Sequence, residues 1–214
     1  MGLVECLSLF CIVVTVASFS AGIPPCRQIL QNRSTRDIPF MPFINGAIIN
    51  ISILWYGYLK EDFTVIVVNT IGSIIHVAYV LIYNVYSHQK TNTLKKTLLG
   101  TAILSILYIY LQMIVVERAA IVQRLGMLTL VLLMHGNLSP LLALIDVVKT
   151  KSSHGVALPF TIAMLVTSIL WLLYGFVVND VYILIPSISG MVSSMIQLVF
   201  VVIYPPKKSA EKTE

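Results

Sequence analysis

The 214-residue sequence is poor in charged side chains, which make up only 11% of the chain, whereas 57% of its residues are hydrophobic. A soluble globular domain carries about 25% charged residues. The composition therefore excludes a soluble globular domain, a disordered chain and a fibrous protein. Cysteine is also scarce. Cys6, Cys11 and Cys26 form no CxxC pair and no Cys/His spacing typical of zinc, so we expect three free thiols.

Motifs that carry enzyme chemistry are missing as well. The sequence has no GxSxG, HExxH or Walker motif, and no paired aspartates inside an apolar run. We therefore expect neither an enzyme nor a metal or cofactor site. The net charge is +5, but the basic residues are spread between long apolar runs instead of gathering on one solvated face, so a nucleic-acid partner is not expected.

Seven apolar runs are long enough to cross a membrane, because a hydrocarbon core about 30 Å thick requires roughly 20 residues of helix. The second run is short and contains Asn45 and Asn50. The alternative for the first run is a cleaved signal peptide, but the absence of a positively charged start favours a retained helix. The predicted spans are Leu3–Ile23, Phe43–Leu59, Val65–Tyr86, Leu98–Val116, Met127–Val147, Leu158–Val178 and Tyr182–Tyr204.

Basic residues divide unequally when alternate connections are assigned to the two sides of the membrane. One side has eleven and the other three, namely Lys60, Arg118 and Arg124. Basic loops mark the cytosolic side, so the C-terminal tail is expected in the cytosol and the N-terminus outside or in a lumen. The eleven are Arg27, Arg33, Arg36, Lys90, Lys95, Lys96, Lys149, Lys151, Lys207, Lys208 and Lys212.

The sequence repeats itself at an offset of 116–118 residues. The stretch Ser52-Ile53-Leu54-Trp55-Tyr56-Gly57 and Asp62 return as Ser168-Ile169-Leu170-Trp171, Tyr174-Gly175 and Asp180. Because three spans reverse the chain, a fourth helix restores the direction, which predicts an all-α membrane protein of two parallel three-helix bundles joined by a linker helix, a transporter architecture. The expected segments are a first repeat over 1–90, a linker over 91–125, a second repeat over 126–204 and a cytosolic tail over 205–214.

With these motifs the sequence resembles the SWEET sugar-transporter family, over about residues 5–204. Further matching motifs are Leu138-Ser139-Pro140-Leu141, Pro159-Phe160 and Val67-Val68-Asn69-Thr70, the last being similar to animal members. The resemblance implies facilitated, bidirectional movement of mono- or disaccharides, with a glucose-like substrate, by alternating access. It also implies residence in the plasma membrane or the Golgi.

The same resemblance implies which residues meet the sugar. Asn69 matches a family asparagine, while Ser187 replaces the second one, and Trp171 matches a family tryptophan. The first-half equivalent of that tryptophan is Ile53, with Trp55 displaced by two positions. A sugar needs amides or hydroxyls for its own hydroxyls and an aromatic plane for its C–H face, and these residue types provide both.

Prolines are implied to act as hinges, because a proline inside a span removes a backbone hydrogen bond and kinks the helix. Pro42, Pro140 and Pro159 match family positions, and either Pro24 or Pro25 fills the first one.

Carboxylates are absent from the middle of every predicted span, where proton or sodium coupling usually requires one. Only His76 and His135 are titratable there, and a helix–helix hydrogen bond is the favoured interpretation of each. We therefore expect a uniporter whose partners are sugar and lipid, with a homo-oligomer left open. The alternatives are a transporter of another small polar solute such as an amino acid, and a seven-helix receptor that does not transport.

Overall fold

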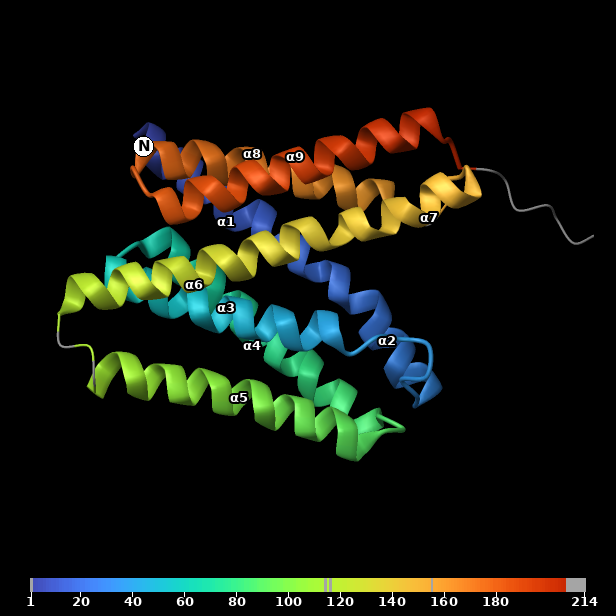
Figure 1. Cartoon of the computed structure of the whole chain (residues 1–214), viewed down its shortest axis with the longest axis horizontal. Coiled ribbons are helices and arrows are strands. Elements are labelled where there is room, and N and C mark those ends of the chain that lie inside the picture. Colours follow the sequence, from blue (N-terminus) through green and yellow to red (C-terminus); the bar gives the residue numbers. More distant parts are fainter. Residues whose placement is uncertain (1, 114, 116, 155, 207–214) are drawn as a thin grey trace, which may run out of the picture. The chain divides into compact units, whose positions relative to one another are not determined.

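The computed structural model describes residues 2–113, 115, 117–154 and 156–206, and the described chain is helical throughout (Figure 1). Val116, Gly155 and residues 207–214 lie outside the described residues, and with them the expected end of the fourth span and most of the expected tail. The described helices are α1 (Leu3–Phe19), α2 (Ile23–Asn32), α3 (Met41–Lys60), α4 (Phe63–Tyr86), α5 (Lys90–Met113), α6 (Arg118–Leu138), α7 (Ala143–Thr150), α8 (Leu158–Val177) and α9 (Val181–Ile203), with 3-10 turns η1 (Ser20–Gly22) and η2 (Ser139–Leu142).

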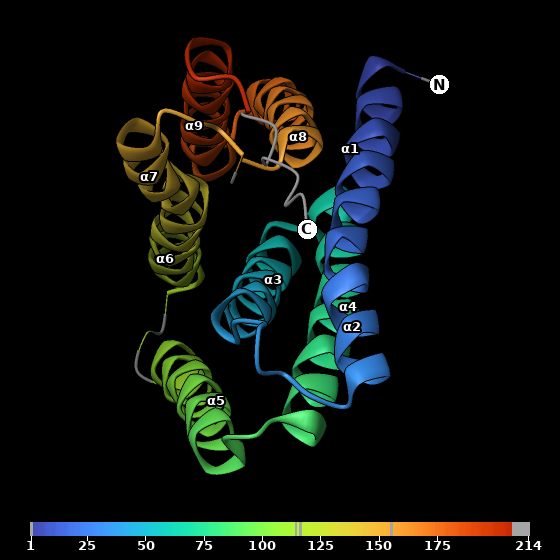
Figure 2. The same ribbon diagram turned by 90° about the vertical axis from the view of Figure 1, so that its right-hand side faces the viewer.

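Two compact units divide the chain. One covers Ser8–Thr129, and the other the described residues from Leu130 onward together with those up to Leu7. In the first unit α4 packs against α2, α3 and α5, and Figure 2 shows α1 and α2 following one another along α4. In the second unit α9 packs against η2, α7 and α8. The third helix of each repeat is therefore the one that contacts the other two.

Among the described residues, six stretches of helix are long and apolar enough to cross a membrane, and α3 is not one of them. This helix is the second predicted span, which is short and contains the polar residues Asn45 and Asn50. Helix extends beyond the predicted spans at four places. It continues past Ile23 to Asn32 and past Val147 to Thr150, and it begins at Lys90 before Leu98 and at Arg118 before Met127. Charged residues mark where the apolar stretch ends, but backbone hydrogen bonds carry a helix further, beyond that stretch.

The second and third helices of each repeat form the same hairpin. Asp62 caps α4 by accepting from the Val65 amide at 3.0 Å, and Asp180 caps α9 by accepting from the Tyr182 amide at 2.9 Å. The residue before each aspartate has a left-handed backbone. Glu61 has a φ of 57° and ends α3, and Asn179 has a φ of 53° and ends the turn after α8. A side-chain cap together with a left-handed residue is a standard way to stop one helix and start another. The repeated aspartates therefore encode this turn.

Glycines allow the helices of each unit to approach closely. A Cβ on Gly72 of α4 would collide with the Asn50 side chain of α3 and with the Phe19 ring of α1 at 2.8 Å. Its repeat partner Gly190 lies in α9, where a Cβ would come 2.5 Å from the Ser168 hydroxyl of α8. Small residues at crossings are how membrane helices gain packing contacts without a hydrophobic driving force.

Burial is distributed as expected for helices in lipid. Large apolar side chains such as Met113 and Phe176 are exposed, whereas Thr161, Ser193 and Ser194 are buried. An apolar cluster of buried residues lies in the first unit. It consists of Cys26, Ile29, Phe40, Phe43, Ile44, Ala47, Tyr79, Val80 and Tyr83.

We predict that Gly72→Ala destabilises the protein by about 1–3 kcal/mol, the usual cost of overpacking, because α1 and α3 must move away from α4. The measurement is the melting temperature of the purified protein in detergent. Gly2→Ala is the control, since nothing lies within 4 Å of a Cβ at that position. Equal melting temperatures for the two variants would contradict the close approach.

Candidate functional site

Asn69, the first predicted sugar contact, lies buried in the second turn of α4. Its Nδ2 donates to the Val65 carbonyl one turn earlier at 2.8 Å. This is the only hydrogen bond of the side chain within the described part of the chain. One N–H and the amide oxygen therefore have capacity for further partners. Leaving a buried polar group without a hydrogen bond costs about 1–3 kcal/mol.

Ser187, the second predicted contact, has the equivalent position in α9. Its Oγ donates to the Ile183 carbonyl at 2.6 Å, again one turn earlier. The hydroxyl proton is thus satisfied by the helix itself, and the oxygen keeps its lone pairs for a donor. Asn69 and Ser187 therefore present the same geometry in the two repeats, with a shorter side chain and fewer bonding groups in the second.

The helix register brings Ile53 level with Asn69. In the antiparallel pair α3 and α4, Gly57 lies against Val65 and Gly46 against the His76 ring, as the contacts of a Cβ at each glycine show. One turn along both helices from the Gly57 contact leads to Ile53 on α3 and to Asn69 on α4. The sequence could not supply this pairing, because it depends on how deeply two helices overlap.

The same register in the second unit brings Trp171 level with Ser187. A Cβ on Gly175 of α8 would lie 3.0 Å from the Ile183 side chain of α9. Further along the pair, the Thr161 hydroxyl lies 3.4 Å from the Gln197 side chain. Trp171 on α8 and Ser187 on α9 lie between these two contacts, each one turn from the contact of Gly175 with Ile183. Each unit thus brings one polar group and one large side chain to the same level.

The two tryptophans differ in their surroundings. The Trp171 ring is half-buried and meets Tyr174 edge-on, with ring centroids 5.6 Å apart. The Trp55 ring packs on Tyr108 of α5, with centroids 5.1 Å apart. Trp55 therefore has a helix-packing contact that accounts for its position, and its predicted contact with sugar is still a prediction.

A polar group that the sequence analysis did not assign lies at the crossing of α6 and α9. Pro186 is inside α9, and the Asn137 Nδ2 of α6 donates to its carbonyl at 2.8 Å and to the Ser189 hydroxyl at 3.2 Å. The Ser189 hydroxyl also donates to the Pro186 carbonyl, at 2.7 Å. Asn137 was visible in the sequence only as part of an Asn-x-Ser triplet. A polar residue in an apolar run, 49 positions before a proline, gives no sign of this contact.

A second polar group surrounds His76. Its Nδ1 lies 2.9 Å from the Gly72 carbonyl in α4 and 3.4 Å from the Asn50 Nδ2 in α3. The Phe19 ring meets the imidazole edge-on, with centroids 5.3 Å apart. The contact with Asn50 agrees with the expected helix–helix interaction, although the shorter contact is to the histidine's own helix. His135 is exposed near the end of α6.

The predicted hinge prolines occupy two kinds of position. Pro24 and Pro25 open α2 directly after η1, and Pro140 lies in η2, so the first helix of each repeat is interrupted there. Pro42 and Pro159 stand in the first turns of α3 and α8. A proline in a first turn costs no helical hydrogen bond, so these two start helices instead of kinking them.

One family model matches the chain twice, over residues 5–91 and 123–209, and its description is a sugar efflux transporter for intercellular exchange. The predicted internal repeat is thereby confirmed. Two similar curated proteins are both named sugar transporter SWEET1. The one from Mus musculus is 37% identical over 94% of this chain and 91% of its own length. The one from Homo sapiens is 36% identical over 92% of this chain and 90% of its own length.

A solved structure of a eukaryotic SWEET transporter has the same fold. It superposes with a TM-score of 0.85 over 95% of this chain and 99% of its own, at 18% sequence identity. The predicted all-helical fold of two triplets and a linker helix is thus confirmed.

We predict that Asn137→Ala lowers the stability of the protein by about 1 kcal/mol, because the Pro186 carbonyl loses its donor from α6. The melting temperature of the purified variant in detergent measures this. Asn92→Ala is the matched control, since the Asn92 amide bonds only to the exposed Gln89 side chain at 3.0 Å within the described residues. An unchanged melting temperature for Asn137→Ala would show that this cross-helix bond contributes nothing.

Proposed function

The chain belongs to the SWEET (MtN3/saliva) family, and on that basis we propose that it moves a glucose-like mono- or disaccharide down its gradient, in both directions, by alternating access. As a SWEET1-like protein it is a multi-pass membrane sugar transporter and not an enzyme. The observation that carries this conclusion is identity of more than 30% to proteins named sugar transporter SWEET1, over nearly the full chain. It favours sugar over the amino-acid and receptor alternatives.

Uniport is supported by where the described carboxylates lie. Asp62 and Asp180 cap helices, Glu61 ends α3, and Glu5 and Asp146 lie within two turns of the ends of their candidate spans. Binding of a proton or sodium ion in the membrane interior usually requires a carboxylate there. A neutral sugar needs none, because amides and hydroxyls match its hydrogen-bonding groups.

We propose that Asn69, Ser187, Trp171, Ile53 and Trp55 contact the sugar. The levels shared by Asn69 with Ile53 and by Ser187 with Trp171 support this for four of them. Asn69 supplies an amide for sugar hydroxyls, and Trp171 a ring face for the C–H side of the sugar. Ser187 accepts a hydrogen bond from the sugar, because its own proton is directed to Ile183.

Alternating access further requires positions that bend. We propose that Pro24, Pro25 and Pro140 allow bending at η1 and η2, where each first helix is already interrupted, and that Pro42 and Pro159 act as pivots at the first turns of α3 and α8. The N-terminus is proposed to face outward or into a lumen and the C-terminus the cytosol, in the plasma membrane or the Golgi. Association of copies into a homo-oligomer is still a prediction, which a mass measurement in detergent would test.

We predict that Asn69→Ala abolishes glucose flux in both directions in proteoliposomes and leaves the melting temperature within a few degrees of the parent. The matched control is Asn84→Ala. Asn84 lies in the same helix and also donates from Nδ2 to the carbonyl one turn earlier, that of Val80, at 3.0 Å, and in addition to the Thr97 hydroxyl of α5 at 3.1 Å. Flux should persist in this control. Normal flux in Asn69→Ala would contradict the proposed contact.

We also predict that labelled glucose enters empty proteoliposomes and leaves preloaded ones at rates of the same order. Neither rate should change when a pH or sodium gradient is imposed, because the proposed site binds no coupling ion. Accumulation of glucose above the external concentration under either gradient would overturn uniport. Saturable binding of glucose without any flux would instead support a receptor.

A further inference from the structure

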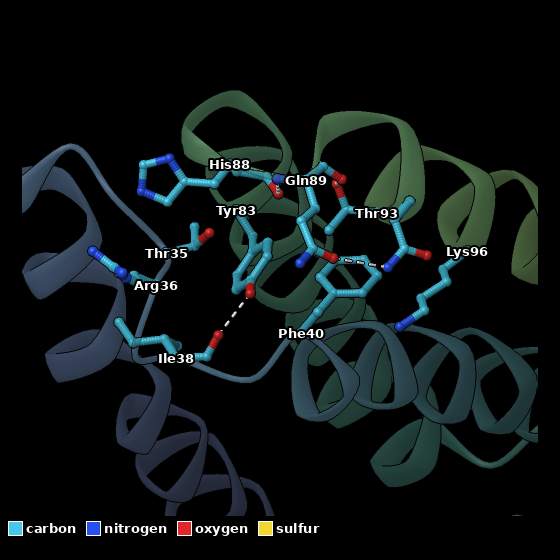
Figure 3. A pocket seen from close by; sticks show the side chains of 11 residues that line it. Thr35, Arg36, Ile38, Phe40, Tyr83, His88, Gln89, Thr93 and Lys96 are labelled. Carbon is cyan, nitrogen blue, oxygen red and sulfur yellow. Dashed lines mark hydrogen bonds between the residues drawn. The ribbon is translucent and has the colours of Figure 1, made fainter.

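A hollow of about 520 Å³ lies at one end of the first unit, and none of the residues proposed to contact sugar lines it (Figure 3). Three segments form it: the connection from α2 to α3, the end of α4, and the first turns of α5. The connection from α2 to α3 and the connection from α4 to α5 both belong to the side with eleven basic residues, which is predicted to face the cytosol.

The lining carries positive charge on two opposite segments. Arg36 comes from the connection between α2 and α3, and Lys96 from the second turn of α5, and no carboxylate lines the hollow. Within the described part of the chain, neither side chain forms an ion pair. Guanidinium and ammonium groups on either side of a cavity favour an anion, and arginine in particular matches the geometry of phosphate.

Polar groups that suit a phosphate accompany these charges. The hollow includes the start of α5, a 24-residue helix whose N-terminus has positive dipole character. His88 also lines the hollow, and its Nε2 lies 2.6 Å from the Ser34 hydroxyl. Gln89 and Asn92 add amide groups, bonded to each other at 3.0 Å.

An aromatic floor completes the hollow. The rings of Phe40 and Tyr83 lie 4.9 Å apart with an angle of 49° between their planes. The Tyr83 hydroxyl donates to the Ile38 carbonyl at 2.6 Å, so the ring is fixed in place (Figure 3). Each of these two aromatic side chains is only 6% exposed, so the floor offers a small apolar area to a ligand.

We propose that this hollow binds a phosphate ester carried on a polyol ring. Arg36 and Lys96 bind the phosphate, the amides bind ring hydroxyls, and Phe40 and Tyr83 form the apolar floor beneath the ligand. Two sources share this chemistry, namely the headgroup of a phosphoinositide in the cytosolic leaflet and a soluble inositol or sugar phosphate. Basic pockets at the cytosolic ends of membrane helices commonly receive such headgroups. The inference does not depend on the proposed sugar contacts or on uniport.

The competing explanation is that Arg36 and Lys96 merely belong to the general positive charge of this side. Lys90 and Lys95 distinguish the two explanations, because they lie on α5 beside Lys96 but do not line the hollow. The test compares Arg36→Gln/Lys96→Gln with Lys90→Gln/Lys95→Gln, two double variants that lose the same charge. Because all four side chains are exposed, both variants are expected to fold, and their melting temperatures without ligand verify this.

The experiment measures binding to the purified full-length chain in detergent, by calorimetry and by the rise in melting temperature that a bound ligand causes. The probes are inositol trisphosphate, glucose phosphate and dioctanoyl phosphatidylinositol monophosphate. Dioctanoyl phosphatidylcholine is the control probe. If the Arg36/Lys96 double variant were unstable, Lys96→Gln alone would replace it, with an expected loss of about threefold or more.

Support for the proposal is binding of at least one phosphorylated probe that weakens about tenfold or more in the Arg36/Lys96 variant and changes less than about twofold in the Lys90/Lys95 variant. Preference for the short-chain lipid identifies the headgroup as the source, and preference for a soluble probe identifies a metabolite. Equal losses in both variants, or no binding of any phosphorylated probe, would overturn the proposal. Glucose flux is not part of this readout, so failure here leaves the proposed function standing.

Discussion

Close approach of helices at two equivalent glycines is the contact on which each half of the molecule depends. Gly72 and Gly190 let the third helix of each repeat lie directly against the side chains of its neighbours. Lipid offers no hydrophobic reason for helices to associate, so packing and interhelical hydrogen bonds must hold them. At both crossings the neighbour is polar, Asn50 in the first repeat and Ser168 in the second. The glycines thus provide the space, and the polar side chains fill it.

The same constraint explains why the residues proposed to contact sugar also bond to their own helices. A buried polar group without a partner costs about 1–3 kcal/mol, so Asn69 and Ser187 each donate to a carbonyl one turn earlier. Asn69 keeps one N–H and its amide oxygen, and Ser187 keeps its oxygen lone pairs, and a neutral sugar can satisfy these groups without any buried charge. The second repeat has serine where the first has asparagine. Serine is shorter and has fewer bonding groups, so the two proposed sugar contacts are unequal.

Charge in this protein is concentrated at helix ends, where it has separate structural tasks. Asp62 and Asp180 start the third helices, and Arg118 pairs with Glu61 at 2.9 Å on the exposed surface. The hollow at the end of the first unit brings two cations, Arg36 and Lys96, together around a cavity. A ligand bound there would contact α4 and α5 at once, and α4 is also the helix that carries Asn69.

Hydropathy and the internal repeat determined the all-helical class, the order of three, one and three helices, and the equivalence of Asn69 with Ser187. These features depend on composition and spacing along the chain, which a sequence contains in full. Helix ends were less predictable, since helix continues past charged residues to Asn32 and back to Lys90. Only the tertiary structure decided that Ile53 is level with Asn69, that Trp55 packs on Tyr108, and that Asn137 bonds to Pro186. Each of these depends on the register and rotation of one helix against another, and those follow from side-chain packing between segments that are distant in the chain.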